Sequence, residues 1–69
     1  MSQMQIVVNG HERSVPVGCT VDQLLEALDL GGQGLAIAVD RAIVPRSERS
    51  SWVLEAGATV EILRAVGGG

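Results

Sequence analysis

Lysine, tyrosine and phenylalanine are absent from this 69-residue chain, and Trp52 is its only aromatic residue. Without lysine, the chain has no side-chain amine for a Schiff base, for a P-loop, or for acylation in an isopeptide bond. Five arginines against eight acidic residues leave a net charge of -3. A groove that follows phosphates and a platform that stacks bases both lack their usual residues, so we expect no nucleic-acid partner.

Residues that bind metals or form crosslinks are equally scarce. The chain has one histidine and one cysteine, which cannot make an internal disulfide and are too few for a zinc site unless carboxylates or a second chain contribute ligands. No apolar run approaches the length of about 20 residues that spans a membrane, and the N-terminus lacks the basic segment of a signal peptide. We therefore expect a cytoplasmic chain with no metal site and no membrane contact.

The size and composition indicate one small folded domain. Hydrophobic residues make up 46% of the chain and charged residues 19%, a balance typical of globular proteins. A chain of this length has no room for a second domain. We assign residues 1–66 to the domain and residues 67–69 to a flexible glycine tail.

Alternating apolar residues predict a hairpin near the start of the chain. Apolar residues occupy every second position over 4–8, and the alternation resumes over 15–17. Asn9-Gly10 lies between the two segments and is typical of tight hairpin turns. Pro16 cannot donate a ladder hydrogen bond, so the second strand is expected at a sheet edge.

A short amphipathic helix is predicted next. Thr20 and Gln23 have the spacing of a capping box, and apolar residues then recur at helical spacing over 21–28. Gly31-Gly32 gives the chain a place to leave the helix in a left-handed conformation.

The second half of the chain is expected to return as strands. Residues 35–39 alternate, 43–44 form a short strand, and 59–66 form the last strand, whereas 46–58 are mostly irregular and Trp52 covers one end of the core. The predicted fold is an α+β roll, with a mixed sheet of about five strands and one main helix on one face. The expected core consists of Val21, Leu24, Leu25 and Leu28 packed on Met4, Ile6, Val8, Ile37, Val39, Val60 and Ile62.

Several residues that could take part in catalysis or ligand binding are better explained by a structural role. The glycine-rich segment 31–34 follows a helix, whereas phosphate-binding loops open one, so it is interpreted as a turn. His11 lies beside the hairpin turn, with no nucleophile close to it in sequence. Cys19 precedes the helix, a position that can activate a thiol, but a lone cysteine is more commonly a small buried residue. A solvated helix face accounts for Asp22, Glu26 and Asp29.

Four apolar residues fall out of phase with the core, namely Val7, Ala36, Ala38 and Leu63. They are expected on the open face of the sheet, opposite the helix. A patch of small apolar side chains often marks a docking surface, although scattered apolar residues are also ordinary on protein surfaces. We predict a partner-docking face here.

The end of the sequence is the remaining candidate site. Gly67-Gly68-Gly69 follows directly from the last predicted strand and carries no side chains, so it could enter a narrow site and present a carboxylate. A frayed end is the alternative explanation.

Several segments together carry a resemblance that spans nearly the whole chain. They are the opening strand with its Asn-Gly turn, Gly18-Cys19-Thr20-Val21 before Leu24-Leu25, Ile43-Val44-Pro45-Arg46-Ser47, Gly57 with Val60-Glu61-Ile62, and Ala65-Val66-Gly67-Gly68-Gly69. With these residues the chain resembles the ThiS family, the sulfur carriers of thiamine biosynthesis, which have a ubiquitin-like β-grasp fold. It departs from the family pattern at Ala58, where aspartate is common, and at Cys19, where a small or polar residue is more usual.

The resemblance implies a carrier that is not itself an enzyme. Gly69 would be adenylated by a separate ThiF-like enzyme that uses ATP and Mg²⁺, and then converted to a thiocarboxylate that donates sulfur to a ThiG-like thiazole synthase. Gly67 and Gly68 would thread through the partners' active sites. No cofactor is expected to bind this chain, and none of its residues is expected to be catalytic.

Alternatives remain open at this point. A small subunit of the molybdopterin-synthase type, or another sulfur carrier, would use the same glycine tail for a different client. A ubiquitin-like covalent modifier would join its terminal glycine to a target amine. A binding module that happens to end in glycine is the remaining alternative.

Overall fold

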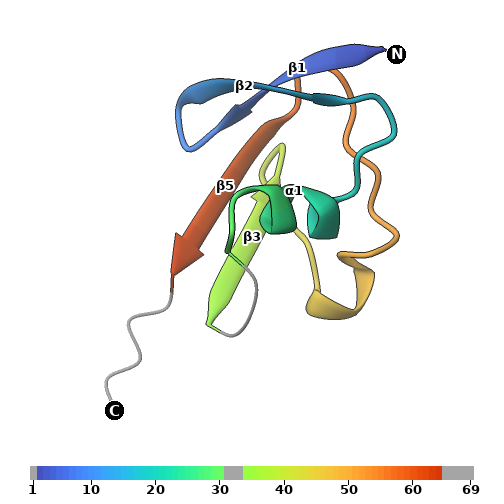
Figure 1. Ribbon diagram of the computed structural model, residues 1–69. Coiled ribbons are helices and arrows are strands. Elements are labelled where there is room, and N and C mark those ends of the chain that lie inside the picture. The colour runs from blue at the N-terminus through green and yellow to red at the C-terminus, as the bar shows by residue number, and fades with distance from the viewer. Residues whose placement is uncertain (1, 31–33, 65–69) are drawn as a thin grey trace.

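The computed structural model describes residues 2–30 and 34–64. Five strands form one sheet, and a helix lies against one of its faces (Figure 1). The elements are β1 (Gln3–Val8), β2 (His11–Pro16), α1 (Val21–Ala27), β3 (Leu35–Val39), β4 (Ala42–Ile43), a 3₁₀ turn (Arg46–Glu48) and β5 (Thr59–Arg64). The predicted α+β roll is therefore confirmed. Within the described residues, no helix is long and apolar enough to cross a membrane.

The sheet is mixed, and its central strand is β5. The strand order is β2-β1-β5-β3-β4. β5 pairs in parallel with β1 and antiparallel with β3, while β2 and β4 add antiparallel edges. The last described strand thus runs between two neighbours, toward the point where the C-terminal segment begins (Figure 1).

The first hairpin turns where the sequence predicts it. Asn9 and Gly10 have φ values of 50° and 83°, the left-handed pair that a two-residue hairpin loop requires. Pro16 pairs with Gln3 on the edge strand, as expected. The strand stops at Pro16, so Val17 does not continue the buried alternation and is 60% exposed.

The capping box of α1 is also confirmed. The Thr20 hydroxyl accepts a hydrogen bond from the Gln23 amide at 3.2 Å, and the Gln23 side-chain oxygen accepts one from the Thr20 amide at 3.0 Å. The helix ends earlier than expected, because Leu28 is its C-cap and Asp29 takes the left-handed conformation at φ 58°. The proposed exit at Gly31-Gly32 lies outside the described residues.

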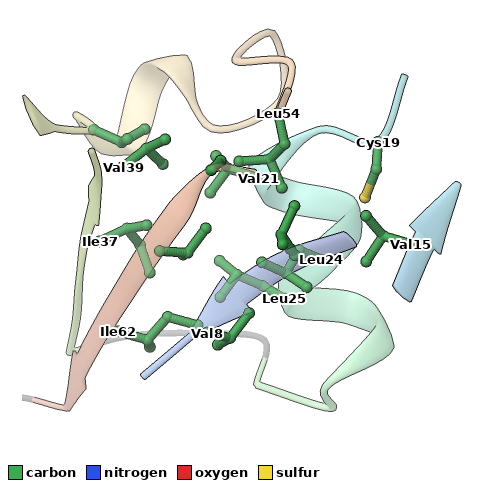
Figure 2. Packing of buried hydrophobic residues seen from close by; sticks show 14 of the residues in the cluster. Val8, Val15, Cys19, Val21, Leu24, Leu25, Ile37, Val39, Leu54 and Ile62 are labelled. Carbon is green, nitrogen blue, oxygen red and sulfur yellow. The ribbon is translucent and has the colours of Figure 1, made fainter. Parts of the chain in front are cut away.

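One hydrophobic core lies between α1 and the sheet. Val21, Leu24 and Leu25 point from the helix toward β1, β3 and β5 (Figure 2). All of the predicted core residues are buried except Leu28, which is partly buried against the cluster. Trp52 packs on the core from outside, as expected.

The segment after β4 contributes more to the core than the sequence indicates. Val44, Leu54 and Ala58 are each at least 97% buried. The Leu54 amide donates to the Cys19 carbonyl at 2.8 Å, which ties this segment to the chain just before α1. The short strand β4 also lies one residue earlier than predicted, at Ala42–Ile43. Val44 follows it and is buried, and its amide still donates to the Ile37 carbonyl at 2.9 Å.

Candidate functional site

The sheet face opposite α1 carries the four apolar residues that the sequence places out of phase. Leu63 is 68% exposed, Ala36 is exposed, and Val7 and Ala38 are half-buried. The register sets Ala36 directly opposite Leu63 on the neighbouring strand. Since side chains on paired positions share a face, the predicted grouping of Ala36 and Leu63 is present.

Ile43 joins this face and was not predicted to do so. It pairs with Ala38 across β3 and β4, and it is 72% exposed. Its neighbour Val44 is buried, so Ile43 points to the opposite face on this extended segment. We define the apolar patch as Ala36, Ala38, Ile43 and Leu63.

Val7 belongs to the same face but lies away from the apolar patch. It pairs with Thr59 on β5, four residues before Leu63 along that strand. Glu61 stands between them on the same face, opposite Ala38. The structure thus joins three of the four predicted docking residues with Ile43, and separates the fourth.

The apolar patch adjoins the base of the C-terminal segment. The last residue of β5, Arg64, pairs with Leu35, and the next pair inward is Leu63 with Ala36. The predicted thiocarboxylate site at Gly69 and the threading residues Gly67 and Gly68 lie outside the described residues. The apolar patch therefore reaches the residue pair next to Arg64, the last described residue before the tail.

The strand that leads to the tail is held on both sides. β5 pairs with β3 from Val60 to Arg64 and with β1 at its first two residues, and the Asn9 side chain exchanges two hydrogen bonds with the backbone of Ile62. Val60 and Ile62 anchor its inner face in the core. The last described residues before the tail therefore belong to a paired strand rather than to a loop.

Cys19 has the structural role expected of it. The side chain is only 6% exposed, its sulfur lies beside Val15 (Figure 2), and Sγ donates a weak hydrogen bond to the Thr20 carbonyl at 3.4 Å. Burial raises the pKa of the Cys19 thiol above its ordinary value. A protonated, enclosed thiol is a poor nucleophile.

The other polar candidates are solvated, as the sequence analysis expects. His11 is exposed on the edge strand β2, and three acidic residues are exposed on or just after α1, namely Asp22, Glu26 and Asp29. Among residues 2–30 and 34–64, no cluster of three histidine, cysteine or acidic side chains could hold a metal ion. These positions add no chemistry to the open face.

Comparison with known proteins identifies the family of this chain. The model of the ThiS family matches residues 6–69. The sulfur carrier protein ThiS of Escherichia coli K12 is 33% identical over 66 residues, which cover 96% of this chain and all of that protein. A thiazole synthase of Paramagnetospirillum magneticum is also 33% identical over 66 residues, but these are 96% of this chain and only 20% of that protein.

A solved structure gives the same answer for the fold. The crystal structure of a thiamine biosynthesis protein (ThiS) from Geobacter metallireducens superimposes with a TM-score of 0.82 at 26% identity, covering 96% of this chain and all of that one. The mixed five-stranded sheet with one helix is thus the ubiquitin-like β-grasp fold that the sequence predicts.

Proposed function

The chain belongs to the ThiS family, and on this premise we propose that it carries sulfur for thiamine biosynthesis as a thiocarboxylate on Gly69. One observation carries the proposal: the match to a sulfur carrier protein covers that protein completely, and the family match runs through the three terminal glycines. As a member of a family of small carriers, the chain acts as a co-substrate of other enzymes.

The chemistry of a carboxylate explains why a carrier needs a separate activating enzyme. A carboxylate is a poor electrophile, because its charge is delocalised and the group to be displaced would be oxide. Attack of the Gly69 carboxylate on the α-phosphate of ATP gives an acyl-adenylate and releases pyrophosphate. Sulfide sulfur then displaces AMP and leaves a thiocarboxylate. A ThiF-like enzyme is proposed to supply the site, ATP and Mg²⁺, with no cofactor held by the carrier.

The proposed sulfur acceptor is a thiazole synthase of the ThiG type. One thiazole synthase contains a segment similar to 96% of this chain, which supports a working association between the two activities. The proposal sets these reactions in the cytoplasm, where ATP is available to the activating enzyme.

Successive partners need a common surface on a carrier. We assign that role to the apolar patch, because it is exposed and adjoins the base of the C-terminal segment. A partner that covers Leu63 and Ala36 there can receive the glycine tail in its own active site. Glycine suits a narrow channel, since it adds no side chain to the path.

Deletion of Gly68 and Gly69 tests the proposal. The shortened chain ends one extended dipeptide early, about 7 Å from the required position, and catalysis does not tolerate such misplacement. Both chains are incubated with ATP, Mg²⁺, the activating enzyme and sulfide, and their masses are measured. We expect the intact chain to gain the mass of one oxygen-to-sulfur exchange and the shortened chain to gain none.

Two results would overturn the proposal. One is an intact chain that never acquires sulfur, and the other is a shortened chain that acquires it equally well. Thermal unfolding of both chains serves as the control, because a difference in folding would obscure the comparison. Higher-mass conjugates in cell extract, in place of the thiocarboxylate, would instead indicate a covalent modifier.

A further inference from the structure

A groove with two arginines opens next to the apolar patch. It has a volume of about 340 Å³ and lies between the start of β3, β4 and the 3₁₀ turn. Ala36 and Ile43 line it and also belong to the apolar patch. Arg46 and Arg49 supply its positive charge. The groove and the apolar patch therefore form one continuous surface.

Arg49 is an unusual residue to find buried. Its side chain is only 9% exposed, although arginine is almost never buried without a partner. One terminal nitrogen, Nη2, donates to the Leu35 carbonyl at 2.6 Å. The buried Nε finds no acceptor among the described residues. The guanidinium thus retains donor capacity that the described part of the chain does not use.

A purely structural role accounts for only part of this arrangement. The bond to Leu35 ties the 3₁₀ turn to the first residue of β3, and the Arg49 carbonyl accepts from the Asp22 amide at the start of α1 at 2.9 Å. The second bond involves backbone alone and needs no arginine. A neutral donor could satisfy the Leu35 carbonyl without the cost of desolvating a charge. The charge itself calls for an anionic partner.

We propose that Arg49, assisted by Arg46, binds a carboxylate side chain of the protein that docks on the apolar patch. This inference rests on the proposed function, since it adds a polar anchor to the surface that the carrier presents. A planar guanidinium matches a carboxylate by two parallel hydrogen bonds. The apolar patch supplies contact area beside it, and the arginines supply orientation and specificity.

Replacement of each arginine by methionine tests the proposal. Arg49→Met and Arg46→Met keep much of the side-chain volume and remove the charge. Arg13→Met is the matched control. Arg13 is exposed on β2 and pairs with Ile6, whose side chain is in the core beneath α1. Since paired residues share a face, Arg13 lies on the helix side of the sheet, away from the apolar patch. Affinities for the activating enzyme and for thiazole synthase are measured by calorimetry at two salt concentrations.

We expect Arg49→Met to weaken binding of at least one partner by about tenfold or more, and Arg46→Met to weaken it less. The control should bind like the parent chain. The salt dependence of affinity should fall in the two groove variants. Unchanged affinity in both groove variants would overturn the proposal and leave Arg49 as a structural tie to Leu35.

A second measurement uses the unaltered sequence and does not depend on how a variant folds. The Arg49 Nε–H resonance is followed by NMR with and without the partner. A shift with slower proton exchange on binding supports the proposal. A resonance that does not change when the partner is added contradicts the proposal. A resonance that changes only when Gly68 and Gly69 are deleted also contradicts it, because that result assigns the site to the chain's own carboxylate.

The two proposals fail separately. If the parent chain is never sulfurated, the carrier function is wrong whatever the arginines do. If the parent chain is sulfurated, and both groove variants match it in affinity for the partners and in the KM of the sulfuration reaction for the carrier, the carrier function stands. Only the carboxylate anchor is then wrong.

Discussion

The side chain of Asn9 pairs with Ile62 as if it were a piece of strand. Its Oδ1 accepts from the Ile62 amide at 2.8 Å, and its Nδ2 donates to the Ile62 carbonyl at 3.1 Å. Asn9 lies in the hairpin turn just after β1 and pairs there with the middle of β5. The parallel contact between β1 and β5 is thereby prolonged beyond the end of β1.

Asn9→Asp should lower the free energy of unfolding by about 1–3 kcal/mol. Aspartate tolerates the positive φ of this position as asparagine does, and its carboxylate can still accept from the Ile62 amide. It cannot donate to the Ile62 carbonyl, and it brings a charge close to that oxygen. Urea unfolding measures the difference. Asn9→Gly, which suits the turn but lacks both bonds, should also be destabilised, and equal midpoints for all three chains would contradict the role.

Leu25→Ala tests the packing of the helix on the sheet. Leu25 is 3% exposed within the core, so its truncation should cost about 2–5 kcal/mol, a large part of the stability of so small a domain. Leu63→Ala is the control, because Leu63 is exposed and should change stability by less than about 0.5 kcal/mol. Equal denaturation midpoints for the two variants would be incompatible with the assigned core.

Leu63→Asp tests the apolar patch. The added carboxylate faces solvent in the free chain, so thermal unfolding should change little. In a complex it would be desolvated against an apolar surface, and we expect binding of the activating enzyme and of thiazole synthase to weaken at least tenfold, about 1.4 kcal/mol. Thr59→Asp, on the same strand and face but away from the apolar patch, is the comparison. Normal assembly of both complexes with Leu63→Asp would exclude the docking role.

Cys19 should make stability fall at alkaline pH. Burial raises the pKa of its thiol in the folded chain above the ordinary value of 9.0. Above that value the unfolded chain releases the proton while the folded chain retains it, so the unfolded state gains stability as pH rises. Stability from this group is complete below about pH 9 and declines through the higher, folded pKa.

The sequence makes this measurement unusually clean, because the chain has no lysine or tyrosine to titrate in the same range. Unfolding midpoints are compared between pH 7 and pH 10 for the parent chain and Cys19→Ala. The parent chain should lose stability more steeply. Parallel curves would mean that the thiol ionises equally well in both states.

Local signals in the sequence were sufficient for the hairpin and the start of the helix. Asn9-Gly10 and the pair Thr20 and Gln23 act through contacts within a few residues, so their patterns specify their structures. Where the helix ends depends on a left-handed residue, and Asp29 takes that role although glycines follow soon after. Aspartate was not an evident choice for it.

Tertiary contacts decided what the sequence could not. Leu54 is buried in an irregular segment because its amide bonds to Cys19 and Val53 bridges to Thr20, and no periodicity marks such a residue in advance. The burial of Arg49 is equally hidden, since arginine is ordinarily exposed. Ile43 completes the apolar patch only through its register with Ala38, which a two-residue strand does not reveal.

The central position of β5 has a consequence for biosynthesis. β5 is translated after every other element of the sheet, yet β1 and β3 have it as their common neighbour. A chain that lacks β5 therefore has two separate strand pairs, β1 with β2 and β3 with β4, each with an unpaired edge, and such edges invite pairing with other chains. Interrupted translation products should be poorly folded and open to proteolysis. Folded copies of the chain would then be almost entirely those whose synthesis had passed the last strand.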